Sequence, residues 1–424
     1  MRHQVSTLIG KGIQYAARLR GGGSALPGLV IEKIDPNFVA RTLAHLPRGI
    51  VIVSGTNGKT TTTKMVVALL ESQGLRVFTN PTGSNFIRGV AAALIDKISS
   101  GGTLTADIAV LELDEAHAVH FVKQVLPRYS LLLNVMRDQL DRFGEIDHTA
   151  SLLHAVAAAT TEGVVINRDD PRLSSPAFRD GLQASVYTYG VSPKLKPLFP
   201  SDDNMRSDLS LEQTRDYHSD DVQLERVGDE DMTISYDGAS HDVQVKLRGA
   251  YNLQNAAGAV ALTKTIMGEQ LDSEIMLRAL SLVTPAFGRG EAIMVDEQPC
   301  ELVLVKNPAG FRLSLASFQA NGHATMIAIN DDYADGRDMS WLWDVDFDSL
   351  DAVETVSGVR AYDMALRLEY DQIRVGPVDT DIETALDHFF SVKKSLPKRI
   401  YCTYTAMLAI RKSMSRYAKV ERVL

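Results

Sequence analysis

Cysteine is almost absent from this sequence, whose 424 residues include only Cys300 and Cys402. Two cysteines cannot form a disulfide framework or a four-cysteine zinc site. Long apolar runs are missing as well, since no segment reaches the roughly 18 consecutive apolar residues that a membrane-spanning helix needs. The N-terminus also lacks the continuous apolar core of a signal peptide. We therefore expect a cytoplasmic protein without structural zinc.

Basic residues are in the minority. Lys and Arg number 44 against 53 Asp and Glu, which gives a net charge of −9. Nonspecific nucleic-acid binding depends on basic residues that neutralise phosphates, so an acidic chain is a poor candidate for it. Hydrophobic residues make up 45% of the chain and charged residues 23%, which is typical of globular domains with a sizeable core. At this length we expect two to three domains.

Short apolar runs alternate with helical segments in the first part of the chain. Such runs are typical of buried parallel strands, and their alternation with helices predicts a doubly wound, mostly parallel α/β sheet. A helix is expected from about Lys59 to Gln73, ended by Gly74. The predicted strands are 50–53, 76–78, 108–113, 130–135 and 163–167.

The sequence becomes acidic near Leu195. Between Ser201 and Asp231 there are eleven Asp and Glu against three Lys and Arg, which predicts a solvated, poorly packed insert at about 190–235. A hairpin with an Asp237-Gly238 turn is expected next, and then a helix from about Asn252 to Met267.

The predicted elements divide the chain into three segments. The first is basic and mildly amphipathic up to Arg20, and we interpret it as a docking helix, with contact to a membrane surface as a second option. The last contains strand-like runs separated by helices, which predicts a smaller C-terminal α/β domain. The segments are an N-terminal helix and lead-in (1–47), a middle domain (48–288) and a C-terminal domain (289–424).

A glycine-bearing loop lies between the first predicted strand and its helix. Backbone N–H groups of such a loop, together with the helix N-terminus, bind phosphates. Lys59 would reach the β- and γ-phosphates of a nucleotide, and the hydroxyl of Thr60 would bind Mg²⁺. The usual phosphate-loop pattern is incomplete, because Val53 occupies the first glycine position. The candidate nucleotide-binding residues are Gly55, Thr56, Asn57, Gly58, Lys59, Thr60 and Thr61.

Acidic residues follow the predicted strand that ends near residue 113. In an open α/β sheet, ligands bind at the carboxyl ends of the strands, and a carboxylate there can hold Mg²⁺ against a phosphate. Glu112 and Glu115 are both candidates, and the sequence leaves open which of them binds the metal.

The loop sequence G-T-N-G-K-T-T resembles that of the Mur ligase superfamily. Residues 134–144 resemble a second block of these ligases, although Gln139 stands where they usually carry histidine. The resemblance implies a Mur ligase middle domain that uses ATP to phosphorylate a carboxylate, which an amine then attacks. It also implies that Asn255 bonds adenine, that Glu112 serves the catalytic metal, and that Arg289 stabilises the transferring phosphoryl group.

Three C-terminal blocks, at 304–311, 329–344 and 403–408, resemble the MurT family, the ligase subunits of lipid II isoglutaminyl synthase. This resemblance implies amidation of the D-glutamate α-carboxyl in the lipid II stem peptide, with ammonia from a GatD-type class I glutaminase in a heterodimer. It further implies that an aspartate of this chain completes the partner's Cys-His pair. Asp344 is our choice, with Asp335 and Asp338 as alternatives. Because lipid II is anchored in a membrane, the protein would work at the inner face of that membrane.

The two cysteines bear on the source of ammonia. A class I glutaminase needs a nucleophilic cysteine activated by a histidine, and neither Cys300 nor Cys402 lies on a glycine-flanked turn at a helix start. The chain is therefore not expected to hydrolyse glutamine. MurT proteins commonly carry a four-cysteine zinc ribbon in the middle domain, and here the corresponding stretch is acidic and free of cysteine.

Two other functions stay open at this point. A self-sufficient amino-acid ligase of the Mur or folylpolyglutamate type would need no partner, but only about fifty residues precede the loop, too few for the usual N-terminal domain. A nucleotide-binding scaffold without catalysis is the second option, against which the retained Lys59, Thr60 and Glu112 argue.

Overall fold

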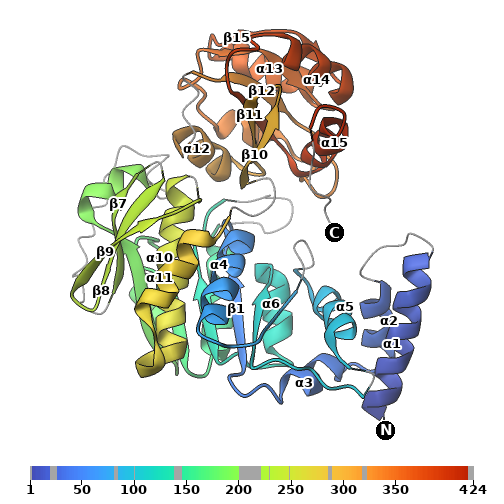
Figure 1. Cartoon of the computed structure of the whole chain (residues 1–424), viewed down its shortest axis with the longest axis vertical. Coiled ribbons are helices and arrows are strands. Elements are labelled where there is room, and N and C mark those ends of the chain that lie inside the picture. Colours follow the sequence, from blue (N-terminus) through green and yellow to red (C-terminus); the bar gives the residue numbers. More distant parts are fainter. Residues whose placement is uncertain are drawn as a thin grey trace. The chain divides into compact units, whose positions relative to one another are not determined.

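The computed structural model divides the chain into two compact units (Figure 1). The first unit comprises 1–135, 147–246 and 252–283, and the second comprises 136–146, 247–251 and 284–424. The predicted domain boundary at 288 falls outside the described residues. Those described are 2–19, 26–80, 85–99, 101–137, 146–199, 221–228, 230–247, 249–284, 289–317 and 322–418.

A sheet of nine described strands forms the centre of the first unit. Neighbouring strands are parallel as far as β7, and β7, β8 and β9 are antiparallel. Every residue of β1, β3 and β5 is buried, which explains their near-continuous apolar sequences. The prediction of a mostly parallel α/β sheet is confirmed. The order is β2(Val77–Thr79), β3(Ile108–Glu112), β1(Ile50–Ser54), β4(Tyr129–Leu132), β5(Gly163–Asn167), β6(Ser185–Val191), β7(Val222–Val227), β8(Asp231–Tyr236) and β9(Ala239–Gln244).

Helices connect these strands. The helix α4 begins directly after Gly58 and is followed by Gly74 at φ 84°, as predicted. The helix expected at 252–267 is also confirmed, and its small and aliphatic side chains are mostly buried. The remaining bounds are α5(Ile87–Lys97), α6(Glu115–Val122), α8(Ile146–Ala159), α9(Pro176–Arg179), α10(Ala250–Met267), α11(Ser273–Leu282) and α4(Lys59–Ser72), with 3₁₀ turns η1(Pro193–Leu198) and η2(Gly268–Gln270).

Three helices precede the sheet. The predicted N-terminal helix is confirmed as α1(Arg2–Leu19), which packs against α2(Leu26–Ile34) and α5 at one edge of the first unit (Figure 1). The short α3(Phe38–Leu43) leads into β1.

The expected acidic insert is smaller than the sequence suggests. Residues 200–220 lie outside the described residues, but β7 and β8 pair with the main sheet, and Val222 and Leu224 are almost fully buried. The prediction of a poorly packed segment was therefore wrong for β7, whereas β8 is the first strand of the hairpin that was predicted. The high count of acidic residues drew attention away from the alternation of apolar and polar residues that is typical of a strand. One of the acidic residues, Asp221, is itself largely buried in an ion pair of 2.7 Å with Arg168.

The predicted turn between the last two strands is confirmed. Asp237 has φ 50° and Gly238 has φ 76°, the left-handed pair that a two-residue hairpin of this twist requires. Asp and Gly are among the residues that adopt it readily.

The second unit has its own sheet of six described strands. Only β10 is antiparallel to its neighbour, so the predicted smaller α/β domain is confirmed in class. The order is β10(Arg289–Val295), β11(Gln298–Leu304), β17(Lys398–Cys402), β12(Ala324–Ala328), β14(Thr355–Ser357) and β16(Val378–Asp379), and β13(Ala352–Val353) pairs separately with β15(Arg374–Val375). The helices are α12(Pro308–Ser317), α13(Ala361–Tyr370), α14(Ile382–Ser391) and α15(Tyr404–Met414), with the 3₁₀ turn η3(Ser340–Asp344).

Two apolar clusters hold this second sheet. One gathers Phe311, Phe347 and Tyr401 with residues of α13 and η3, and the other gathers both cysteines with Phe389 and residues of α15. Large apolar side chains buried on both sides of a sheet are typical of a parallel α/β domain.

Candidate active site

The loop between β1 and α4 requires glycine at two positions. Gly55 has φ 135° and Gly58 has φ 89°, conformations that other residues rarely adopt. A Cβ at Gly58 would lie 2.2 Å from Nδ2 of Asn255, and one at Gly55 would lie 3.0 Å from the backbone nitrogen of Asn134. The loop is thus enclosed by α10 and by the segment after β4, and the predicted residues of the loop and Asn255 come together.

Asn134 fixes the loop through three hydrogen bonds. The backbone N–H of Thr56 donates to its carbonyl oxygen at 3.0 Å, and that of Asn57 donates to Oδ1 at 2.9 Å. Nδ2 of Asn134 donates back to the carbonyl of Asn57 at 3.0 Å. Sequence reasoning did not select Asn134 as a site residue. Its place at the start of the block 134–144 drew attention to it, but its contact with the loop depends on the pairing of β4 with β1, which the sequence does not show.

Lys59 lies over the loop as a buried cation. Its Nζ donates to the carbonyl of Gly55 at 2.5 Å and forms an ion pair with Glu115 Oε2 at 3.3 Å. Both side chains are buried, and a buried cation needs such partners because loss of hydration is costly. The ammonium group is therefore held where the phosphates of a nucleotide would lie on this loop.

Thr60 and Glu112 bring two oxygens together at the carboxyl end of β3. Thr60 Oγ1 donates to Glu112 Oε1 at 2.8 Å, while Asn80 holds the backbone of Glu112 at both its N–H and its carbonyl. Hydroxyl and carboxylate oxygens are the ligands that Mg²⁺ prefers, so these two residues fit a magnesium ion. Glu115 is instead engaged with Lys59.

One further hydroxyl fits a phosphate ligand. Oγ1 of Thr61, on the first turn of α4, is buried and has no hydrogen-bond partner among the described residues. Buried polar groups are rarely left unpaired, so a ligand oxygen at this position would satisfy it.

A buried aspartate, Asp170, holds the segment that follows β4 at the same edge of the sheet. Asp170 accepts backbone N–H bonds from Val135 at 2.6 Å and from Arg172 and Leu173 at 3.0 Å. Burial raises the pKa of Asp170 to about 6. Asp170 thus caps its own turn and also holds the segment that carries Asn134.

One predicted participant cannot be placed in the site. Arg289 begins β10 and pairs with Val303, but its side chain lies outside the described residues. Gln139 also lies outside them.

The three aspartates proposed for the partner's site have different surroundings. Asp335 is buried and accepts from the N–H of Thr405 at 2.8 Å and from the Thr405 hydroxyl, which fixes the start of α15. Asp338 accepts from the N–H of Ser340 at 2.9 Å. Asp344 is half-buried at the end of η3, where its carbonyl accepts from Arg312.

A patch of exposed aromatic and aliphatic side chains lies next to Asp344 in the chain. Trp343 is 50% exposed and packs edge-on against Tyr370, with ring centroids 5.4 Å apart. Tyr370 belongs to α13, which exposes further residues at helical spacing on the same side. Sequence reasoning missed this patch, although the spacing of three and four residues was readable. We define the α13 patch as Trp343, Val359, Tyr362, Leu366 and Tyr370.

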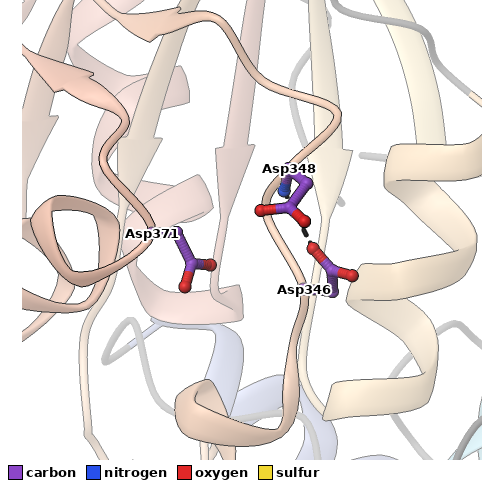
Figure 2. A group of neighbouring side chains, drawn as sticks. All are labelled: Asp346, Asp348 and Asp371. Atoms are coloured by element: carbon purple, nitrogen blue, oxygen red, sulfur yellow. Dashed lines mark hydrogen bonds between the residues drawn. The ribbon is translucent and has the colours of Figure 1, made fainter.

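An acidic cluster in the second unit differs from the Thr60–Glu112 pair in how its carboxylates are bonded. Asp346, Asp348 and Asp371 approach one another (Figure 2). Asp371 forms an ion pair with Arg367, and Asp346 accepts from the N–H of Asp348 at 2.9 Å. These carboxylates are at least partly satisfied by the protein itself, so we assign them to the loop structure.

The two cysteines are unsuited to nucleophilic chemistry. Both are fully buried on adjacent strands, β11 and β17. Burial raises the pKa of Cys300 to about 12 and raises that of Cys402 as well. Since the thiolate is the reactive form, this burial supports the expectation that neither is a glutaminase nucleophile, which stays a prediction.

Comparison with known proteins agrees with this arrangement. A family model described as the Mur ligase middle domain matches residues 53–263, and one described as the MurT ligase C-terminal domain matches 304–407. The chain belongs to the MurT family of Mur ligase-like proteins. The middle-domain match covers the loop, Glu112 and Asn255, and the MurT match covers Asp344 and the α13 patch.

Individual relatives extend the similarity along the chain. The chain is 28% identical to the "Lipid II isoglutaminyl synthase (glutamine-hydrolyzing) subunit MurT" of Streptococcus pneumoniae, over 98% of this chain and 97% of that protein. Among solved structures, a pseudomurein peptide ligase type C from Methanothermus fervidus has a TM-score of 0.68 at 17% identity, covering 90% of this chain and 81% of that one. The MurF ligase of Thermotoga maritima in complex with ADP has a TM-score of 0.67 at 15% identity, covering 92% and 85%. These structures share the Mur ligase fold.

Proposed function

We propose that this protein is an ATP-dependent carbon–nitrogen ligase that amidates the D-glutamate α-carboxyl of the lipid II stem peptide to D-isoglutamine. One observation carries the proposal. A glycine loop with Lys59 held over it occurs in the same chain as a MurT C-terminal match, and both thiols of this chain are buried, with burial raising the pKa of Cys300. Such a protein can activate a carboxylate but cannot release ammonia from glutamine.

In this proposal the loop residues 55–61 bind the phosphates of ATP through backbone N–H groups, and Lys59 neutralises the β- and γ-phosphates. Asn255, whose amide lies against Gly58, bonds adenine. Arg289 stabilises the phosphoryl group during transfer. Thr60 and Glu112 hold Mg²⁺, which supplies charge neutralisation at the phosphates when bound, with Glu115 as the alternative ligand.

The reaction follows from these roles. An oxygen of the substrate carboxylate attacks the γ-phosphorus of ATP, the bond to the β-phosphate oxygen breaks, and ADP leaves. Ammonia then attacks the carbonyl carbon of the acyl-phosphate, inorganic phosphate leaves with the bonding electron pair, and one proton passes from the nitrogen to the departing phosphate. The chain's own residues position the phosphates and stabilise the charge that develops on them.

We further propose that the ammonia comes from a GatD-type class I glutaminase bound as a heterodimer. In this arrangement Asp344 orients the histidine of the partner's Cys-His pair and stabilises its charged form. The α13 patch beside Asp344 supports a partner contact here, because exposed aromatic side chains of this density are typical of binding surfaces.

The alternative, a self-sufficient amino-acid ligase, differs in its nucleophile. It would add a whole amino acid to the carboxylate and would not depend on a second protein. The MurT C-terminal match and the full-length similarity to a MurT subunit favour amidation over this alternative.

Product mass distinguishes the two reactions. We expect the protein, given lipid II, ATP and ammonia, to yield a product lighter by about 1 Da, since an OH becomes an NH₂. Glutamine should replace ammonia only when a glutaminase partner is present. A product heavier by one amino-acid residue would contradict the proposal.

The substrate also suggests a location. The part of the chain that the structure describes contains no helix with the length and apolar character needed to span a bilayer. We propose a cytoplasmic protein that associates peripherally with the inner face of the membrane where lipid II is anchored.

A further inference from the structure

Helix α1 turns its apolar side away from the protein. Val5, Leu8 and Tyr15 are 53%, 58% and 68% exposed, and Ile9 is 37% exposed. Their spacing places them, with Gly12, along one side of the helix. A surface helix ordinarily packs its apolar side against the core and leaves its polar side in water. We call these five residues the α1 stripe.

The opposite side of α1 is polar or small, and it is the side that is buried. Ser6 is buried and its hydroxyl donates to Asp35 Oδ2 at 2.8 Å. Gln14 Nε2 donates to Asp96 Oδ1, on α5, at 3.3 Å. A Cβ at Gly10 would lie 3.0 Å from Ile95 Cδ1, so α1 approaches α5 closely. These contacts fix the rotation of the helix about its axis and keep the stripe exposed.

The charge on α1 is opposite to that of the whole chain. The helix sequence contains Arg2, His3, Lys11 and Arg18 and no acidic residue, whereas the chain has a net charge of −9. Lys11 is half-buried on the helix next to the stripe. The adjoining α2 adds Leu26 and Ile34, which are 49% and 44% exposed.

We propose that the α1 stripe binds the surface of an anionic lipid bilayer, with α1 lying parallel to it. An exposed apolar side with basic residues is the composition of interfacial helices, and basic residues near an anionic surface are attracted to it. A second copy of this chain is a poorer occupant, because two such helices would bring like charges together. The inference rests on the peripheral membrane association given under the proposed function and assigns it to α1, although bilayer binding itself does not depend on which substrate is amidated.

Vesicle flotation with the full-length protein tests this proposal. The probe is a phosphatidylcholine vesicle containing about 30% phosphatidylglycerol, compared with pure phosphatidylcholine. Wild type should float with the anionic vesicles and less with the neutral ones. The double variant Leu8→Gln/Ile9→Gln should lower the partition coefficient at least about tenfold. The matched control Leu126→Gln/Leu282→Gln, at positions 61% and 63% exposed elsewhere in the first unit, should float as wild type does.

Three results would overturn the proposal. The wild-type protein does not float with anionic vesicles, or the Leu8→Gln/Ile9→Gln variant floats as well as wild type. In the third, this variant differs from wild type only in its oligomeric state, measured by light scattering. Ammonia-driven amidation of detergent-dispersed substrate should be the same in wild type and variant. Failure of that reaction in both would count against the proposed function and leave the flotation result standing.

Discussion

The two sheets carry polar residues at the same kind of edge and use them differently. In the first unit Lys59, Glu112 and Asn134 follow parallel strands and fix the glycine loop and the start of α4. In the second unit Asn330 and Thr403 follow β12 and β17 and bond mainly to each other and to neighbouring loops.

The difference lies in charge and backbone conformation. The first edge has a buried cation and two left-handed glycines at the start of a helix, which together bind anions. The second edge has the neutral side chains of Asn330 and Thr403 and the carboxylate of Asp335, which accepts from Thr405 and anchors the segment that leads to Trp343 and Asp344. Residues that follow the carboxyl end of a parallel strand are therefore polar in both units. Whether they bind a ligand depends on their charge and on the backbone conformation of the loop that carries them.

The strongest test of this contrast removes the cation from the first edge. Lys59→Ala should lower both ammonia-driven and glutamine-driven amidation by about a hundred- to a thousandfold, because the phosphates lose their main neutralising group. Steady-state ATP turnover measures this. Lys97→Ala, on the last turn of α5, is the matched control and should keep full activity. Retained activity in Lys59→Ala would contradict the assignment of the nucleotide site.

A substitution of Asp344, in the second unit, should affect only the amidation that uses glutamine as its nitrogen source. Asp344→Asn should lower glutamine-driven amidation in the complex by about a thousandfold, because the partner's histidine loses its orienting carboxylate. Ammonia-driven amidation should stay within about twofold of wild type. Asp346→Asn, an exposed aspartate two residues further on, is the control. Equal loss of both activities would assign Asp344 to the ligase site or to the fold.

The bonds within the second edge should contribute mainly to stability. Asp335→Ala leaves the N–H of Thr405 and its hydroxyl without their acceptor and should lower the free energy of unfolding by about 2–4 kcal/mol. Both tryptophans, Trp341 and Trp343, belong to the second unit, so their fluorescence in denaturant reports on this unit. Asp338→Ala should cost no more than about 1 kcal/mol. Equal effects would show that Asp335 is not the main anchor of this loop.

The smallest expected effect is a pH dependence in the first unit. Because the folded pKa of Asp170 is raised to about 6, folding favours its protonated form. Its stability contribution is then largest below the unfolded pKa of about 4 and falls by about 1–3 kcal/mol as the pH rises to about 6. The difference in unfolding free energy between wild type and Asp170→Asn, followed by circular dichroism, should show this fall. A difference that stays constant with pH would contradict the raised pKa.

Much of the fold and the loop could be predicted because they depend on local chemistry. The β-branched runs, the glycines around Lys59 and the Asp237-Gly238 turn each have a direct backbone consequence. The strand β7 was missed because acidic residues alternate with the buried Val222 and Leu224, whereas β8 belongs to the hairpin that was predicted. The bonds that bring Asn134 to Thr56 and Asn57 join segments far apart in the sequence, so only the sheet order reveals them.

The source of the nitrogen tests the central claim most directly. The protein alone, supplied with ATP, lipid II and glutamine labelled with heavy nitrogen at its amide, should incorporate no label. It should incorporate heavy nitrogen from labelled ammonium, or from the same glutamine once a glutaminase partner is added. Incorporation from glutamine by the protein alone would contradict the claim that this chain activates the carboxylate and depends on a partner for ammonia.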